Sequence, residues 1–270
     1  EVERVIDHLK GTDDGPTVVF FGGIHGNEPA GVFALKQVFG EIRESHLPIR
    51  GEVYGLAGNL GALQNGTRYQ KEDLNRIWFP NRIDGISLES SNGYDEELEL
   101  QNLYALLREI IKNGKPPFYF LDLHTTSSDS SPFMVMNDSL LNRKFASQYP
   151  LPVILGIEEY LHGALLSYIN ELGYVSLGFE SGQHDDERAI ENSVNFVQYS
   201  LGLTQSIALS ERRMAALKWA ISRAATAPHK FYEIYHQHDI GPDGHFNMFP
   251  GFVNFQVVAK GRSLAMVDGV

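Results

Sequence analysis

The chain has 270 residues, a formal net charge of −12 and no cysteine. Its 43% hydrophobic and 21% charged residues are ordinary for a globular protein, so we expect one large domain, or one with a small addition. The negative charge argues against nucleic acid or an anionic membrane as partner, and the lack of cysteine excludes disulfides and thiolate chemistry. Any metal site must therefore use histidine and carboxylate ligands.

The N-terminal end carries no secretory signal, and no apolar stretch approaches the roughly 20 residues of a membrane span. We therefore expect a cytoplasmic protein with a small-molecule partner, and a homo-oligomer is left open. Because the first residue is Glu1 rather than methionine, we also expect the natural N-terminus to lie upstream.

Apolar runs alternate with helical patterns over most of the chain. Buried strands are expected at 18–21, 53–57, 118–123, 153–155 and 174–179. Helices are expected from Pro29 onward and at 96–112, 164–172, 187–199 and 211–224. In the first helix, the expected apolar stripe consists of Phe33, Leu35, Val38 and Phe39. The alternation predicts a three-layer α/β/α fold with a mainly parallel, mixed central sheet.

The pattern changes after Pro228. Short strands joined by glycine-rich turns are expected at 231–235, 252–259 and 264–267. We interpret residues 1–228 as a catalytic domain and 229–270 as a β-rich C-terminal segment. That segment ends without an obvious end to its pattern, so we expect it to be incomplete.

Four chemically active side chains follow predicted strands. His25 and Glu28 come three residues apart after the first strand, His124 ends another, and Glu180 ends a third. Ligands of open α/β sheets bind beyond the carboxyl ends of the strands, so these side chains are expected to meet. Two histidines and one glutamate are the ligand set of hydrolytic zinc sites, which leave a position for water. Each residue alone is more typical of a loop or a helix start, and the conjunction carries the prediction.

Asn75 and Arg76 supply planar donors suited to a carboxylate, and Arg68 lies a short way upstream in the sequence. Asn75 and Arg76 belong to the run Asp-Leu-Asn-Arg at 73–76, which precedes the aromatic pair at 78–79. Taken alone, that run is more typical of a solvated polar loop. It becomes a candidate part of a functional site only because the histidines and glutamates described above accompany it.

These motifs form a known combination: Gly-Gly-x-His-Gly-Asn-Glu-Pro at 22–29, Asp-x-Asn-Arg at 73–76, Asp-Leu-His at 122–124 and a late Glu180. In this combination the sequence resembles the succinylglutamate desuccinylase/aspartoacylase family, which is related to zinc carboxypeptidases. The resemblance covers residues 18 to about 185, and residues 246–268 resemble the start of the family's C-terminal β domain. It implies a zinc-carboxypeptidase-like fold.

The resemblance also implies roles. One zinc ion would be held by His25, Glu28 and His124. Glu180 matches the general base and Arg68 the arginine that polarises the scissile carbonyl. Asn75 and Arg76 match the pair that binds a substrate carboxylate. The expected reaction is hydrolysis of the amide bond of a small N-acyl amino acid.

Two rival functions stay open: a zinc carboxypeptidase acting on peptides, and a metal-binding module without catalysis. One departure from the family concerns the substrate. Where aspartoacylases carry a further substrate arginine, this chain has Asn170, which argues against N-acetylaspartate.

Several other features are given structural interpretations. His236 and His238 are expected on an exposed strand face, and His184 in a loop. The acidic run at 95–99 is expected to be a solvated helix start. Both tryptophans are expected in the core.

Overall fold

The computed structural model describes residues 2–84, 95–241 and 244–267. Eight strands form the central sheet: β1 (Val5–Lys10), β2 (Asp13–Gly22), β3 (Arg50–Ala57), β4 (Phe118–Thr126), β5 (Phe133–Val135), β6 (Val153–Leu155), β7 (Val175–Gln183) and β8 (Phe231–Glu233). Their order across the sheet is β1-β3-β2-β4-β7-β5-β6-β8. Five of the seven pairings are parallel, and only β1 with β3 and β5 with β7 are antiparallel. The predicted mixed, mainly parallel sheet is confirmed.

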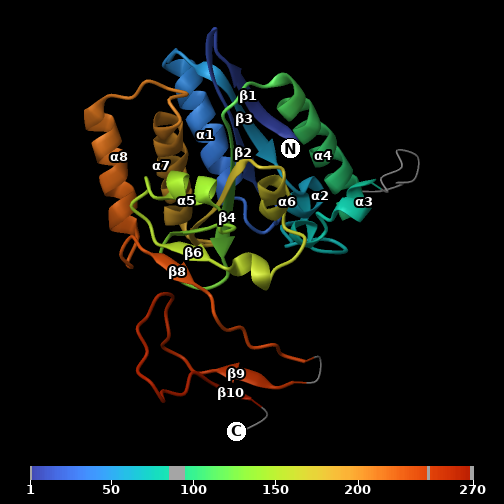
Figure 1. Ribbon diagram of the computed structural model, residues 1–270, viewed down its shortest axis with the longest axis vertical. Helices are drawn as coiled ribbons and strands as arrows, with labels where there is room; N and C mark the ends of the chain where they lie inside the picture. Colours follow the sequence, from blue (N-terminus) through green and yellow to red (C-terminus); the bar gives the residue numbers. More distant parts are fainter. Residues whose placement is uncertain (1, 85–94, 242–243, 268–270) are drawn as a thin grey trace.

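Helices cover both faces of this sheet (Figure 1). One face carries α1 (Ala30–Glu44), α5 (Leu140–Ala146), α7 (Glu187–Leu203) and α8 (Glu211–Ala224). The other carries α2 (Leu60–Asn65), α3 (Pro80–Asp84), α4 (Glu96–Asn113) and α6 (Leu165–Glu171). Each face buries its own apolar cluster, which gives the three predicted layers. None of the helices in the described ranges has both the length and the hydropathy of a membrane span.

The chain leaves this body after β8, which still pairs with β6 at the edge of the main sheet. In the C-terminal segment, β9 (Phe246–Met248) and β10 (Ala265–Val267) form a small antiparallel sheet. Figure 1 shows this segment projecting from one end of the body. The division of the chain near residue 228 into two domains stays a prediction.

Three strands, β1, β5 and β9, were not predicted from the sequence, and one predicted strand does not form. β1 is a half-buried edge strand and β5 has only three residues, so neither shows a continuous apolar run. The strand predicted at 252–259 is wrong, because β10 pairs with β9 instead. Val257 is 96% exposed, which shows that β-branched residues without a partner strand do not make a ladder.

Two aromatic side chains predicted to be buried are exposed. Phe33 points away from the apolar face of α1 and is 52% exposed, whereas Leu35 and Val38 are fully buried. Trp219, on α8, is 62% exposed and lies under the guanidinium of Arg223. Trp78 alone of the two tryptophans is in the core, as predicted.

Candidate metal centre and active site

The register of the central strands brings the predicted site residues together. In the parallel pair of β4 and β7, His124 lies directly opposite Glu180. β2 is the other neighbour of β4, and it ends at Gly22, just before the turn that carries His25 and Glu28. The three strands therefore deliver their side chains to one edge of the sheet, as the sequence predicts.

Glycine makes the turn after β2 possible. Gly23 adopts a positive φ of 71°, which glycine accepts without strain. A Cβ on Gly26 would come within 2.0 Å of the backbone of Ala62, so only glycine lets this turn pack against α2. The close packing fixes the direction in which His25 leaves the backbone.

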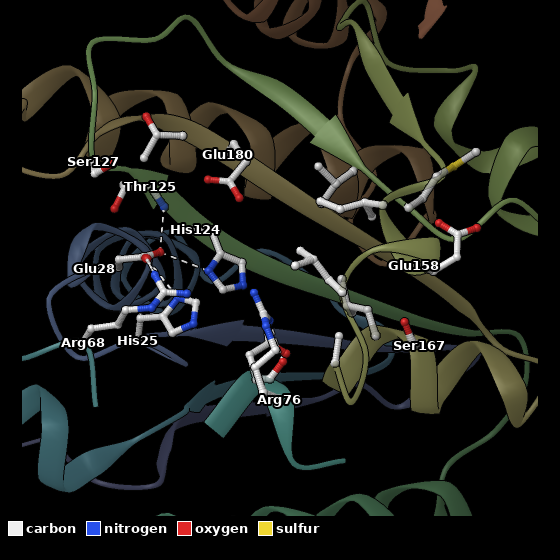
Figure 2. Close-up of a pocket in the computed structure, with 18 of the residues that line it drawn as sticks. His25, Glu28, Arg68, Arg76, His124, Thr125, Ser127, Glu158, Ser167 and Glu180 are labelled. Atoms are coloured by element: carbon white, nitrogen blue, oxygen red, sulfur yellow. Dashed lines mark hydrogen bonds and ion pairs between the residues drawn. The ribbon is translucent and has the colours of Figure 1, made fainter. Parts of the chain in front are cut away.

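His25, Glu28 and His124 form a buried cluster whose possible ligand atoms all lie within 4.8 Å of one another. Nδ1 of His25 lies 2.9 Å from one oxygen of Glu28, and Nδ1 of His124 lies 3.0 Å from the other. Figure 2 shows the three side chains converging on one point. Glu28 also accepts a hydrogen bond from the backbone N–H of Thr125, at 2.9 Å.

A carboxylate stands behind each imidazole. Nε2 of His25 donates to Asp73 at 3.1 Å, and Nε2 of His124 donates to Asp122 at 2.7 Å. With Nε2 fixed as a donor in this way, loss of the Nδ1 proton would direct the Nδ1 lone pair at the centre of the cluster, which is the tautomer a metal ligand needs. Asp73 and Asp122 belong to the sequence motifs, but the sequence analysis assigned no role to either.

The cluster perturbs the ionisation of its members. Burial alone would raise the pKa of Glu28, but hydrogen bonds from His124 and His25 outweigh it and hold that pKa well below its usual range. Burial alone would lower the pKa of His124, but the carboxylates of Asp122 and Glu28 raise it well above its usual value. Glu28 therefore keeps its negative charge inside the cluster, where that charge would face a bound cation.

Glu180 lies beside the cluster without joining it. Its Oε2 is buried and has no hydrogen-bond partner in the described part of the chain. Burial, helped by the carboxylates of Glu28 and Asp122 and opposed by His124, raises the pKa of Glu180 to about 7. A carboxylate with that pKa can both accept and release a proton near neutral pH.

The acidic run at 95–99 starts a helix, as predicted, but it is solvated only in part, because Glu97 is exposed whereas Glu96 and Glu99 are buried. Asp95 caps α4, accepting from the backbone N–H of Leu98, but Glu96 and Glu99 are only 1% and 3% exposed. Glu99 accepts from the backbone N–H of Gly61 and pairs with Arg4. The helical pattern places these two carboxylates on the inner face of α4, where distant backbone groups satisfy them.

Glu96 holds the segment that carries Arg68 and Asp73. It accepts hydrogen bonds of 2.7–3.2 Å from the backbone N–H groups of residues 70–72 and from the side chain of Asn59. The buried carboxylate therefore anchors an irregular segment against α4. Arg68 then bonds to Asp73 at 3.0 Å and lies 3.5 Å from Glu28, at the edge of the cluster.

Asn75 and Arg76 form a 3₁₀ turn, Leu74–Arg76, and line the same pocket. Oδ1 of Asn75 accepts from the backbone N–H of Leu165 at 2.9 Å, so this side of the amide caps α6. The NH₂ side has no partner among the described residues. Arg76 donates to the carbonyl of Asn75 and makes no ion pair within the described ranges. Both residues keep free donors.

The pocket has a volume of about 420 Å³ and extends well beyond the cluster. Its wall includes residues that the sequence analysis did not assign to the site, among them Thr125, Met136, Glu158 and Ser167. His184, predicted as a loop residue, also lines it and lies 2.7 Å from the hydroxyl of Thr125. Only its position four residues after Glu180 pointed there. His236 and His238 are exposed, as predicted, but the strand predicted for them is wrong, because both lie after β8.

An open α/β sheet with two histidines and a glutamate gathered at the carboxyl ends of its central strands defines a class: α/β proteins with the ligand set of zinc hydrolases. Within that class, the chain belongs to the succinylglutamate desuccinylase/aspartoacylase family. The family model of the catalytic domain matches residues 14–196, which confirms the resemblance.

Individual relatives agree with this assignment. The chain is 28% identical over 151 residues to succinylglutamate desuccinylase of Photorhabdus laumondii subsp. laumondii, covering 55% of this chain and 44% of that protein. It is 31% identical over 124 residues to aspartoacylase of Xenopus tropicalis, covering 45% of this chain and 38% of that protein. The chain thus matches less than half the length of these curated relatives.

Solved structures show the same fold. A succinylglutamate desuccinylase/aspartoacylase from Rhodobacter sphaeroides superposes with a TM-score of 0.68 at 20% identity, covering 96% of this chain and 74% of that one. Succinylglutamate desuccinylase from Vibrio cholerae gives a TM-score of 0.65 at 21% identity, with the same coverage.

Proposed function

We propose that this chain is a zinc-dependent hydrolase that cleaves the amide bond of a small N-acyl amino acid. The observation that carries the proposal is the buried cluster of His25, Glu28 and His124 beside the unpartnered carboxylate of Glu180. A module that only binds metal needs the cluster but not Glu180. The relatives named succinylglutamate desuccinylase and aspartoacylase support removal of an acyl group.

The cluster fits zinc by its chemistry. It offers two imidazole nitrogens and one carboxylate, the ligand set of open hydrolytic zinc sites. The carboxylates of Asp73 and Asp122 fix the tautomers of both imidazoles and make them better ligands. When bound, zinc supplies Lewis acidity, which polarises a carbonyl and makes water more acidic.

The protein groups around the cluster have separate roles in proton transfer, oxyanion stabilisation and substrate binding. Glu180 takes a proton from the attacking water and passes it to the leaving amine, which its raised pKa permits. Arg68, at the edge of the cluster, donates to the oxyanion that develops on the scissile carbonyl. Arg76 and the amide of Asn75 hold the substrate carboxylate and so set the register of the scissile bond.

The choice of substrate separates this proposal from a carboxypeptidase. The zinc-loaded chain is assayed with short N-acyl amino acids and with peptides of three to five residues that are blocked at the N-terminus and free at the C-terminus. Faster hydrolysis of the N-acyl amino acids is expected, because a pocket of about 420 Å³ suits a small ligand. Hydrolysis of the peptides alone would establish the carboxypeptidase instead.

Asp122→Asn is expected to weaken zinc binding by about 10- to 100-fold. The amide keeps a hydrogen bond to Nε2 of His124 but removes the charge that makes the imidazole a strong ligand. Zinc dissociation constants are measured by competition with a chelator. The control is Asp7→Asn, which removes a carboxylate paired with Arg43 at the surface. Equal affinities in the two variants would deny Asp122 this role.

Arg76→Lys tests the carboxylate clamp. Lysine keeps the charge but loses the fork, so kcat/KM for an N-acyl amino acid is expected to fall by about 10-fold or more. The fall should be much smaller for the matching α-amide, because only the acid presents two charged acceptor oxygens. If both substrates slow by the same factor, Arg76 does not bind the carboxylate and serves only to anchor the segment before Trp78.

A further inference from the structure

The pocket carries one unengaged cation and one unengaged carboxylate oxygen outside the zinc cluster and Glu180. Arg68 is paired with Asp73, whereas Arg76 has no ion-pair partner in the described ranges. Glu158 uses one oxygen to accept from the backbone N–H of Asp138, at 2.8 Å. Its other oxygen, Oε2, is buried and has no hydrogen-bond partner. A buried carboxylate oxygen in a pocket wall needs a donor, and no described residue supplies one.

The two groups lie at different parts of the same pocket. Figure 2 shows Arg76 next to the histidines and Glu158 on the opposite side, near Ser167. The wall of this pocket also includes the apolar side chains of Val135, Met136, Ile157, Leu161 and Leu166. A ligand complementary to this pocket has a carboxylate for Arg76, an apolar stem for the wall and a terminal hydrogen-bond donor for Glu158.

Asn170, the departure from the resemblance noted above, lies outside this pocket. Asn170 accepts a hydrogen bond from the side chain of Asn142 at 3.0 Å and does not line the pocket wall. Among the described lining residues, the only lysine or arginine side chains are Arg68 and Arg76. A second substrate carboxylate near Glu158 would meet a like charge without a compensating cation.

We propose that the pocket selects N-acyl amino acids with a positively charged side chain, such as Nα-acyl diamino acids, and rejects N-acyl dicarboxylic amino acids. The α-carboxylate binds Arg76, the stem passes the apolar wall and the ammonium group pairs with the carboxylate of Glu158. This inference rests on the proposed function and names its substrate class.

Three substrates whose side chains share a three-carbon stem test the selectivity. Nα-acetylornithine carries the ammonium, Nα-acetylnorvaline has the same stem without it, and Nα-acetylglutamate ends in a carboxylate. For the zinc-loaded chain, kcat/KM is expected to be about 10- to 100-fold higher for the ornithine compound than for the norvaline compound, and lowest for the glutamate compound. A fourth substrate, N-(4-aminobutyryl)norvaline, moves the ammonium to the acyl chain. Preference for it would assign Glu158 to the acyl group instead.

Two variants provide the matched comparison. Glu158→Gln keeps an oxygen to accept from Asp138 but loses the charge, so the preference for the ornithine compound over the norvaline compound should disappear. Glu159→Gln makes the same change on the exposed neighbouring side chain, which does not line the pocket, and should leave the preference intact. Equal effects of the two variants, or a wild-type preference for the glutamate compound, would overturn the proposal.

Binding measurements separate this proposal from the proposed function. Calorimetric dissociation constants for the same three acetyl amino acids, measured on zinc-loaded Glu180→Gln so that the substrates are not consumed, report the charge preference without turnover. Preferred binding of the ornithine compound with no hydrolysis would sustain the pocket assignment and reject the deacylase. Hydrolysis without a charge preference in binding or turnover would sustain the deacylase and reject the role of Glu158.

Discussion

Glu180→Gln is expected to keep the zinc ion and lower kcat by at least about 100-fold, the usual scale for loss of a general base. Glutamine has nearly the same shape as glutamate but cannot take a proton from water. Glu180 forms no hydrogen bond with the ring nitrogens of the cluster, since His25 and His124 bond to Glu28, Asp73 and Asp122 instead. Zinc occupancy should therefore be unaffected.

The measurement combines elemental analysis of zinc with steady-state kinetics on an N-acyl amino acid. Glu187→Gln serves as the control, because that side chain is exposed at the start of α7 and outside the pocket. Near-normal turnover in Glu180→Gln would mean that another group moves the proton. His184, which also lines the pocket, would then be the next candidate.

The same variant has a pH signature in the zinc-free protein. The pKa of Glu180 is raised from 4.5 to about 7 in the folded chain, so its contribution to stability is full below pH 4.5 and is lost as pH rises through 7. Glutamine cannot ionise, so Glu180→Gln should gain stability relative to the wild type over this range, by as much as about 3 kcal/mol. Urea unfolding at pH 4.5 and pH 8 measures the difference. A constant difference would contradict the raised pKa.

His124→Ala is expected to remove most of the bound zinc and with it the activity. The site keeps only His25 and Glu28, two ligands where a hydrolytic zinc site uses three. The substitution also leaves the carboxylate of Asp122 buried without its partner, which costs about 1–3 kcal/mol of folding free energy. Circular dichroism therefore accompanies the elemental analysis.

Two further variants make this result interpretable. His25→Ala removes the other imidazole, whose partner Asp73 still bonds to Arg68, and should also lose zinc. His236→Ala removes a histidine from the exposed C-terminal segment and should keep full occupancy. Zinc retained in both His124→Ala and His25→Ala, or lost in His236→Ala, would contradict the ligand assignment.

Local sequence patterns determined the layers of the fold and the core of the site. The spacing of Leu100, Leu103 and Leu107 predicted α4, and the apolar run at 118–123 predicted most of β4, because both depend on periodicity within one element. His25 and Glu28 were recognisable as a pair because their three-residue spacing lets one turn aim both side chains at the same point.

Only the tertiary structure decided how distant residues support that site. Glu96 belongs to an acidic helix start by sequence, yet it is buried because the backbone of residues 70–72 donates to it across the fold. Asp73 gains its role from an imidazole 48 residues away, whereas Asp122 bonds to His124 two residues along the same strand. Glu158 lines the pocket from a short turn whose sequence shows no hydrophobic periodicity. Partners of this kind depend on non-local contacts, which leave no periodic signal in the sequence.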